Sequence, residues 1–294
     1  MSMVDRLYSV LKNLNRHWKA FVILVSASVI LYIIGVVFLF ATFSVTSDSM
    51  YPTLHKNDRI IVLKPIIGAR LFNVFDAIEG KPFNVHRITG LWKIKRNDVI
   101  VFNFPYYEWN KWDKIYLNLK EYYVKRCIGL PGDSIYSEKG IYGIWNIKCI
   151  LGNISMQVNN TEDFTSKQYS HIFVEDSILN WNIKDWGPIY IPHKGNRIKI
   201  NKGNILLYKN IIEWESGKHI IISNNDIMMN DKPLQEYTFI HDYYFMAGDN
   251  ISISVDSRYW GFVPDVFIVG KAYCLIGHTS KNTREGKKWF KKIE

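Results

Sequence analysis

An apolar run without a single charge, at positions 20–45, constrains the fold of this chain more than any other feature of its sequence. As a helix rising 1.5 Å per residue, these residues would span roughly 39 Å, enough to cross a hydrocarbon core of about 30 Å with some tilt. A cleaved secretory leader has an apolar run of only about 7–15 residues before a small-residue cleavage site. We therefore expect a permanent transmembrane anchor at 20–45.

The charges on the two sides of this run indicate its orientation. Basic residues outnumber acidic ones in residues 1–19, whereas residues 46–54 contain no Lys or Arg and include Asp48. Cytoplasmic flanks of membrane helices carry the excess of Lys and Arg. We therefore expect a single-pass protein whose N-terminus is cytoplasmic and whose chain from residue 46 onward lies on the opposite side of the membrane.

The formal net charge of +10 is concentrated at the two ends of the chain. Residues 281–294 carry six basic and two acidic side chains, which predicts either a solvated basic tail or a segment attracted to anionic lipid headgroups. The sequence contains no helix-turn-helix, zinc-finger or RNA-binding signature, so we do not expect a nucleic-acid partner.

The cysteines are few and widely spaced. Cys127, Cys149 and Cys274 define neither a disulfide framework nor a metal site, and we expect free thiols, although a bridge between Cys127 and Cys149 stays open. Cys274 and His278 would supply only two ligands to a zinc ion, which is too few for a site. We expect no metal and no cofactor.

Short β-like runs separated by Gly, Asn, Asp and Pro follow the apolar segment. They occupy residues 59–63, 98–102, 122–128, 197–200, 204–208, 219–222, 237–240 and 267–269. Residues 134–245 contain no candidate chemistry. The pattern predicts a mainly β, antiparallel protein in which residues 134–245 are inserted between two halves of a catalytic unit.

The first candidate for chemistry is Ser49, in the string Ser-Asp-Ser-Met-Tyr-Pro-Thr-Leu at 47–54. A serine on a turn just beyond the anchor is well placed to meet a substrate at the membrane surface. Its hydroxyl becomes a nucleophile only if a base takes its proton. Considered alone, a turn serine is more often structural than catalytic.

The second candidate is Lys125, within the run 122–133. Strand alternation puts Tyr123, Lys125 and Cys127 on one face. On an inward face the lysine would be desolvated, which lowers its pKa from about 10.4 by as much as 3–5 units and makes it a neutral base. The alternative is an ordinary solvated strand lysine.

The third candidate is the segment 246–264, in which a Gly-Asp-Asn turn precedes Ser254, Asp256 and Arg258. The hydroxyl of Ser254 could orient the base, and Asp256 and Arg258 could form an ion pair that holds the loop. The alternative is a structural polar β-turn followed by aromatic residues that pack into the core.

Together these segments resemble the bacterial type I signal peptidases. The shared signatures are Ser-x-Ser-Met-x-Pro-Thr-Leu, Lys-Arg-x-x-Gly-Leu-Pro-Gly-Asp and Gly-Asp-Asn...Asp-Ser-Arg-Tyr-Trp-Gly, with the run 96–102 between the first two. The match covers residues 46–63, 96–105, 123–134 and 247–271, in the order of the family and after its membrane anchor. The resemblance implies a mainly β fold: an N-terminal transmembrane helix followed by two antiparallel β-sheet domains, the second inserted into the catalytic one.

The resemblance also implies roles for single residues. Ser49 matches the family's nucleophile and Lys125 its general base. The oxyanion hole corresponds to Ser47 with the amide of Ser49. The remaining matches are the lysine-orienting Ser254, the supporting pair Asp256 and Arg258, and the substrate-pocket residues Met50, Leu54, Tyr123 and Val124.

The implied activity is that of an endopeptidase that cleaves N-terminal signal peptides from exported preproteins after small residues, through a Ser/Lys acyl-enzyme mechanism. Its implied partners are preproteins emerging from the export translocon and the phospholipid bilayer. The implied location is the bacterial cell membrane, with the catalytic domain on the extracytoplasmic side.

The expected division of the chain follows from these features. It comprises a cytoplasmic N-terminus (1–19), the anchor (20–45), a catalytic β domain (46–133 and 246–280), an inserted β domain (134–245) and a basic C-terminal tail (281–294).

Three departures from the family pattern keep alternatives open. Asp48 and Asn97 each replace a usual Gly, and Ile-Ser-Ile at 251–253 replaces a more polar triplet. We expect Asp48 to face solvent, because a carboxylate pointing inward would oppose a developing oxyanion. Asn97 is compatible with left-handed backbone angles.

Other functions remain as alternatives. A Ser-His-Asp hydrolase could use His241 and Asp242, or another of the eight histidines, although no Gly-x-Ser-x-Gly elbow is present. A self-cleaving peptidase of the repressor type shares a Ser/Lys pair, and an inactive peptide-binding relative is kept open by Asp48.

Overall fold

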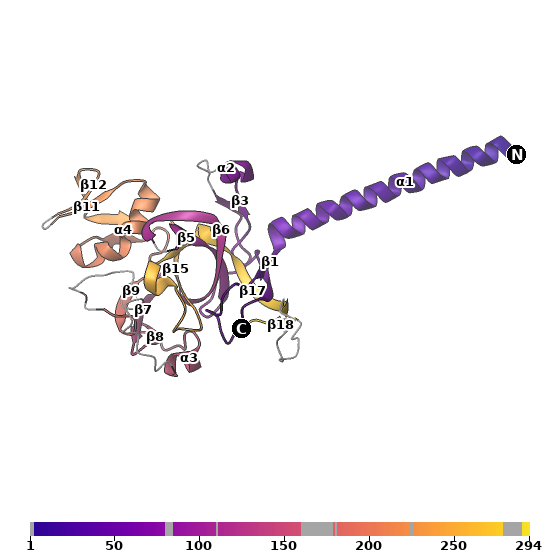
Figure 1. The fold of residues 1–294 in the computed structure, drawn as a ribbon. Coiled ribbons are helices and arrows are strands. Elements are labelled where there is room, and N and C mark those ends of the chain that lie inside the picture. Colours follow the sequence, from indigo (N-terminus) through magenta and orange to yellow (C-terminus); the bar gives the residue numbers. More distant parts are fainter. Residues whose placement is uncertain are drawn as a thin grey trace.

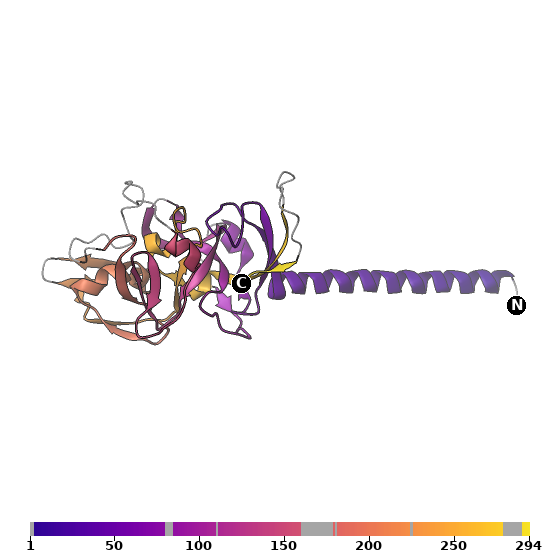
Figure 2. The same cartoon turned by 90° about the horizontal axis from the view of Figure 1, so that it is seen from below.

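The computed structural model describes residues 3–79, 85–109, 111–159, 179, 181–223, 226–278 and 290–294. A long helix, α1 (Met3–Ile34), projects from a β body that meets it at its C-terminal end (Figure 1, Figure 2). A short π-helix, η1 (Gly35–Leu39), continues it into strand β1 (Phe40–Ser44). The segment Arg16–Leu39 is long and apolar enough to cross a membrane.

The predicted end of the anchor at residue 45 was wrong. Residues 40–44 form β1, which pairs antiparallel with β2 (Asp58–Leu63) from Phe40 opposite Leu63 to Ser44 opposite Arg59. Hydropathy does not distinguish an apolar strand from the end of an apolar helix, so the change of structure at Phe40 is hidden within one uncharged run.

The main sheet is antiparallel and combines strands from both halves of the chain. Its order is β1, β2, β17 (Ile268–His278), β5 (Val99–Glu108), β6 (Lys111–Gly129), β15 (Tyr243–Ala247) and β16 (Val263–Pro264), with β18 (Lys291–Lys292) on β17. The strands predicted at 59–63, 98–102, 122–128 and 267–269 are confirmed in this sheet.

The main sheet is strongly curved. β1 and β6 are not neighbours in the strand order, yet the rings of Phe43 on β1 and Tyr122 on β6 lie 4.9 Å apart. This curvature brings the segment that follows β1 opposite the middle of β6.

The described residues between 134 and 238 form smaller elements beside the main sheet (Figure 1). They comprise β7 (Ser134–Glu138), β8 (Ile141–Ile144), α3 (Ile154–Val158), β9 (Trp186–Tyr190), β10 (Arg197–Lys199), α4 (Lys202–Ser216), β11 (Ile220–Ile222), β12 (Ile227–Met229), β13 (Lys232–Pro233) and β14 (Glu236–Thr238). Elsewhere lie β3 (Arg70–Leu71), α2 (Val74–Glu79), β4 (His86–Arg87), α5 (Ser257–Trp260) and η2 (Asp265–Phe267).

The strand predicted at 204–208 was wrong, because these residues belong to α4. Asn201 caps the helix in a capping box with Asn204, and Gly217 ends it in the left-handed conformation at φ 64°. The buried positions Ile205, Tyr208, Ile211 and Ile212 recur every three or four residues. A short apolar run is ambiguous, and only this longer spacing indicates the helix.

The buried side chains form two clusters. The first joins Phe102 and Phe245 of the main sheet to Ile205 and Ile212 of α4, so the elements at 134–238 share a core with the sheet. The second lies under the turn that follows β1 and consists of Val45, Met50, Leu54, Ile60, Val62, Val99, Val101, Val269, Ala272 and Ile293.

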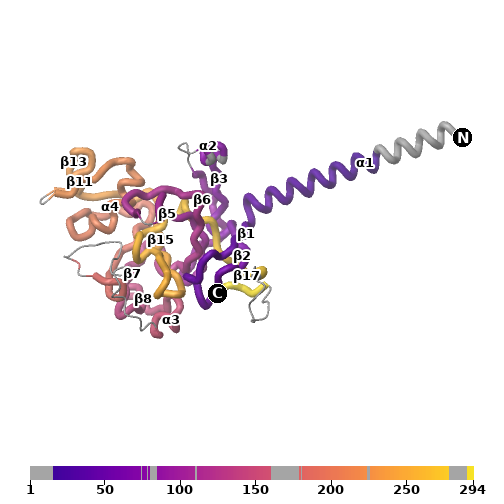
Figure 3. The backbone as a smooth tube through the Cα atoms, in the orientation of Figure 1, coloured from indigo at the N-terminus to yellow at the C-terminus, as the bar shows by residue number. Residues whose placement is uncertain are grey.

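The expected basic tail at 281–294 needs a correction at its end. Residues 281–289 lie outside the described residues, but β18 pairs with β17, and Ile293 is 6% exposed within the second cluster. The amide of Ile293 donates to the carbonyl of Tyr273 at 2.9 Å. Residues 290–294 are therefore part of the folded body, and this end of the chain lies beside β17 (Figure 3).

The three cysteines are free thiols, as expected. Cys127 is buried, Cys149 is exposed and Cys274 is half-buried, and none of them forms a disulfide. The bridge between Cys127 and Cys149 that the sequence left open is absent.

Replacing Ile293 by Ala is expected to lower the free energy of unfolding by about 2–4 kcal/mol, because it leaves a cavity in the second cluster. Thermal or denaturant unfolding of the detergent-solubilised protein measures the change. Lys292→Ala is the matched control, since that side chain is 66% exposed. An Ile293→Ala protein as stable as the control would contradict the docking of this segment.

Candidate active site

The turn that carries Ser49 is anchored by its neighbours. Residues 45–57 connect β1 to β2, and the side chains of Met50 and Leu54 point into the second cluster with exposures of 1% and 0%. The amide of Leu54 donates to the carbonyl of Met50 at 2.9 Å. The burial of these two residues fixes the turn, and Ser49 itself is only 9% exposed.

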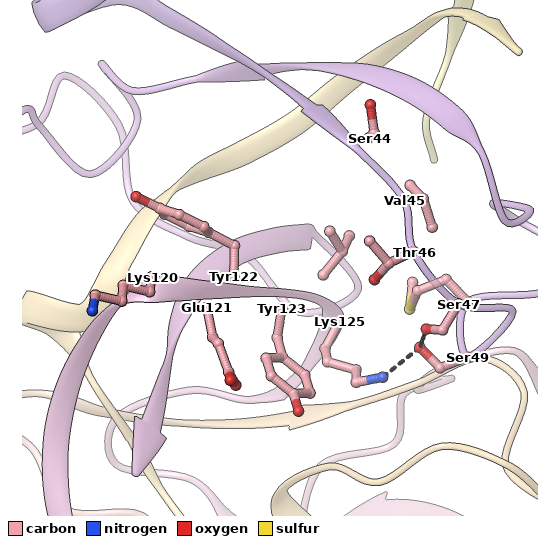
Figure 4. A pocket seen from close by; sticks show the side chains of 12 residues that line it. Ser44, Val45, Thr46, Ser47, Ser49, Lys120, Glu121, Tyr122, Tyr123 and Lys125 are labelled. Atoms are coloured by element: carbon pink, nitrogen blue, oxygen red, sulfur yellow. Dashed lines mark hydrogen bonds between the residues drawn. The ribbon is translucent and has the colours of Figure 1, made fainter. Parts of the chain in front are cut away.

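Lys125 reaches this turn from the middle of β6. Its side chain extends toward Ser49, and Nζ donates to Ser49 Oγ at 2.5 Å (Figure 4). The two residues are 76 positions apart in the sequence and meet because the main sheet is curved. If the amine is neutral, the same contact allows Ser49 to donate its proton to Nζ.

The surroundings of Lys125 favour the neutral amine. The side chain is 2% exposed, and burial lowers its pKa to about 8. The charge of Asp256 raises the pKa by a smaller amount, and that of Arg258 lowers it. The lowered pKa agrees with the prediction from strand alternation.

Ser47 lies on the other side of Ser49. Its hydroxyl donates to Ser49 Oγ at 3.2 Å (Figure 4). Asp48, between the two serines, is exposed, and its carboxylate accepts a hydrogen bond from the amide of Lys56 at 2.8 Å. Asp48 therefore faces solvent, as expected.

Ser254, Asp256 and Arg258 form a buried network. Ser254 Oγ donates to Asp256 Oδ2 at 2.7 Å, and Arg258 donates to both carboxylate oxygens at 2.7 and 2.8 Å. Burial alone would raise the pKa of Asp256, but the charge and hydrogen bonds of Arg258 outweigh it and hold that pKa below its ordinary value. The expected ion pair is thus formed.

The sequence predicted that Ser254 orients Lys125. Within the described residues, Lys125 donates to Ser49 and Ser254 donates to Asp256, and the two side chains form no hydrogen bond with each other. Because Ser254 gives its proton to Asp256, its oxygen can act only as an acceptor. That orientation would suit an N–H group of Lys125.

The loop at 248–250 touches the backbone of the serine turn. A Cβ on Gly248 would lie 2.5 Å from the carbonyl oxygen of Ser49 and from the Cβ of Ser254. The amide of Asn250 donates to the same carbonyl at 3.0 Å. Glycine at 248 thus lets the third motif pack directly against the first.

A second buried ion pair lies on the opposite face of β6 and had no role in the sequence prediction. Arg126 donates to both oxygens of Asp249 at 2.7 Å, and Thr53 donates to Asp249 Oδ2 at 2.5 Å. Arg126 also donates to the main-chain oxygens of Asn97 and Glu294. Both residues stand in motifs that the sequence analysis recognised, Arg126 in Lys-Arg and Asp249 in Gly-Asp-Asn. Their pairing could not be predicted, because only the tertiary structure brings the two motifs together.

A pocket of about 400 Å³ opens beside the pair (Figure 4). One wall is the segment after β1 and the other is β6. The lining residues are Ser44, Val45, Thr46, Ser47, Ser49, Met50, Lys120, Glu121, Tyr122, Tyr123, Val124 and Lys125. Met50, Tyr123 and Val124 are among them as expected, whereas Leu54 is not, because its side chain is fully buried in the second cluster.

The alternative histidine site has a different set of contacts. His241 Nδ1 lies 2.9 Å from Asp265 Oδ1, and its ring packs on Trp214. Asp242 accepts a hydrogen bond from the amide of Lys194. None of these residues lines the pocket beside Ser49.

The described part of the chain holds no group of three or more His, Cys, Asp or Glu side chains that could bind a metal ion. The side chain of His278, the second residue of the zinc alternative, lies outside the described residues.

Comparisons with known proteins identify relatives along most of the chain. The family model described as signal peptidase, peptidase S26, matches residues 16–170 and 190–276. Signal peptidase I of Buchnera aphidicola subsp. Acyrthosiphon pisum is 33% identical over 263 residues, covering 84% of this chain and 71% of that protein. Signal peptidase I of Helicobacter pylori is 26% identical over 268 residues, covering 88% and 82%. A crystal structure of a signal peptidase I from Enterococcus faecalis matches with a TM-score of 0.30 at 20% identity, covering 61% of this chain and 96% of that one.

Replacing Lys125 by Met is expected to stabilise the protein at pH 7 by about 1–3 kcal/mol. The folded-state pKa is about 8 and the unfolded one about 10.4, so the folded state binds its proton less tightly. This penalty is fully present below pH 8 and disappears as the pH rises toward 10.4. The lost hydrogen bond offsets about 1 kcal/mol of the gain.

Thermal unfolding of the two proteins at pH 7 and pH 10 tests this expectation. The gain should shrink at pH 10. Lys120→Met, at an exposed position of the same strand, should change stability little at either pH. A Lys125→Met protein that is less stable than wild type at pH 7 would show that the buried amine is not a destabilising element.

Proposed function

The chain belongs to the signal peptidase family of peptidase S26, and from that premise we propose that Ser49 and Lys125 are its nucleophile and general base. The chain is a membrane-anchored serine peptidase that removes signal peptides from preproteins. The observation that carries the assignment of residues is the 2.5 Å contact between Lys125 Nζ and Ser49 Oγ, with both side chains buried.

In the first half of the proposed reaction, neutral Lys125 takes the proton from Ser49 as Oγ attacks the carbonyl carbon of the scissile bond. The Ser47 hydroxyl and the Ser49 amide then donate hydrogen bonds to the tetrahedral oxyanion, and each such donor contributes about 10²–10³ in rate. The C–N bond breaks as the Lys125 ammonium returns the proton to the leaving amine. The product is an ester between Ser49 and the signal peptide.

In the second half, Lys125 takes a proton from a water molecule that attacks the ester carbonyl. The C–O bond to Ser49 breaks, and Oγ recovers its proton from the Lys125 ammonium. Ser254 would hold an N–H of the amine so that its lone pair points at Ser49. The Asp256–Arg258 pair would keep Ser254 in that orientation, since both of its members are buried and hydrogen-bonded to the same loop.

We assign the substrate to the pocket between residues 44–47 and β6. One wall is strand β6, along which an extended peptide can lie, and Met50, Tyr123 and Val124 supply apolar contacts. Cleavage after small side chains is the specificity that the resemblance to the family implies for this pocket. Preproteins that emerge from the export translocon would enter from the side of the anchor.

The orientation in the membrane is also a proposal. Basic residues precede the anchor and none follows in residues 46–54, which favours a cytoplasmic N-terminus and an extracytoplasmic catalytic domain. Contact of the basic segment at 281–294 with anionic lipid belongs to the same proposal.

We further propose that residues 46–133 and 246–280 form the catalytic β domain and that residues 134–245 are an insertion. The strand order supports this division, because the main sheet draws its strands mainly from the first two ranges. The shared first cluster means that the insertion and the sheet fold around one core.

Substitution of the pair tests the assignment. Ser49→Ala and Lys125→Ala should each lower the rate of preprotein cleavage by about 10³-fold or more, because each removes a member of one catalytic unit. His241→Ala should cleave at a rate close to wild type. Cleavage is followed by the mobility shift of the preprotein with purified enzyme in detergent. Full activity in Lys125→Ala, or loss of activity in His241→Ala, would refute the Ser/Lys assignment.

The pH dependence of kcat/KM provides a separate test. Only the neutral amine can take a proton, so the rate should fall about tenfold per pH unit below the Lys125 pKa of about 8 and level off above it. A soluble peptide substrate and a check of folding by circular dichroism at each pH isolate this effect. A rate that stays constant down to pH 5 is incompatible with a lysine base.

A further inference from the structure

The junction between the anchor and the main sheet is unusually well bonded. The last carbonyl groups of a helix have no amide partner within the helix, and leaving them unpaired beside hydrocarbon is unfavourable. At the end of this anchor the carbonyls of Gly35, Val36, Val37 and Leu39 all accept hydrogen bonds.

Lys64 supplies three of these bonds. Its ammonium donates to the carbonyls of Val36 and Val37 at 2.7 and 3.2 Å, and its amide donates to that of Leu39 at 2.9 Å. The positive charge also lies at the negative end of the helix dipole, where a cation is stabilised. Lys64 directly follows β2, so these bonds tie the anchor to the main sheet.

The rest of the junction leaves little room for bending. The amide of Phe40 donates to the carbonyl of Gly35, and a Cβ on Gly35 would lie 3.1 Å from the ring of Phe40. β1 then runs from Phe40 to Ser44, which lines the pocket. These five residues cover about 17 Å, so one short strand separates the end of the anchor from the pocket wall.

We propose that Lys64 is a positioning residue that locks the anchor to the main sheet and thereby sets the height and tilt of the Ser49–Lys125 pair above the bilayer. The inference rests on the proposed function and extends it to substrates held in the membrane. The bilayer fixes the position of an embedded signal peptide, and therefore the height of its scissile bond above the membrane. The scissile bond meets Ser49 only if the enzyme holds Ser49 at the same height and in a suitable orientation. A soluble peptide can adjust its position freely and does not depend on the lock.

The test compares two substrates with the full chain in proteoliposomes. Lys64→Met keeps the length of the side chain and the amide bond to Leu39 but removes the ammonium. It should cleave a soluble peptide spanning the cleavage site at close to the wild-type kcat/KM. It should process a preprotein inserted in the same vesicles about tenfold more slowly, because its site is misplaced relative to the membrane. Lys64→Arg, which restores charge and donors, should recover most of the loss.

Lys93→Met is the matched control, since Lys93 is an exposed lysine, and it should leave both rates unchanged. Cleavage of the soluble peptide also reports that the catalytic body is folded. Equal loss on both substrates, or loss on neither, would overturn the positioning role of Lys64. Wild-type enzyme that cleaves neither substrate would instead overturn the proposed function on which the inference rests.

Discussion

The burial of one amine, that of Lys125, is the constraint around which the rest of the structure is arranged. A lysine in the middle of a strand inside a curved sheet loses the water that would keep it charged, and its pKa falls to about 8. The amine donates a hydrogen bond to the hydroxyl of Ser49 at 2.5 Å. The proposed reaction therefore needs no histidine at this pocket, because the lowered pKa makes Lys125 available as a neutral amine that can accept the proton of Ser49.

Two buried ion pairs make this arrangement rigid. Asp256 with Arg258 lies on the Ser254 loop, and Arg126 with Asp249 lies on the other face of β6. Arg126 connects β6 to the serine turn through Asp249 and Thr53, so the strand that bears Lys125 and the turn that bears Ser49 cannot move independently. Removing one member of such a pair would leave an uncompensated buried charge, which is strongly destabilising.

Much of this organisation could be predicted from the sequence, and the exceptions have physical reasons. Short sequence motifs identified Ser49, Lys125 and the Asp256–Arg258 pair, because the residue types in these motifs indicate a particular chemistry. Strand alternation predicted that Lys125 lies on the inward face of its strand. The helix at 202–216 was missed because the short apolar run at 204–208 is compatible with both the helical and the strand periodicity. Leu54 was assigned to the pocket from the family resemblance, and a motif match does not reveal which side of the turn a side chain occupies. Arg126 and Asp249 were not paired because 123 residues separate them and only the curved sheet joins them.

The position of Ile293 in the second cluster determines when this part of the protein can complete its folding relative to synthesis. The cluster under Ser49 combines Met50 and Leu54, made early in synthesis, with Val269 and Ile293, made more than 200 residues later. Strand β2 pairs with β1 on one edge, but its other edge has no partner until β17 has been synthesised. The serine turn and the second cluster beneath it therefore cannot be completed during early elongation. A nascent chain that has already inserted its anchor therefore still lacks part of the apolar cluster that underlies Ser49. The packing under the serine turn is completed only when β17 and Ile293 join the sheet, so the placement of Ser49 opposite Lys125 depends on residues near the end of the described chain.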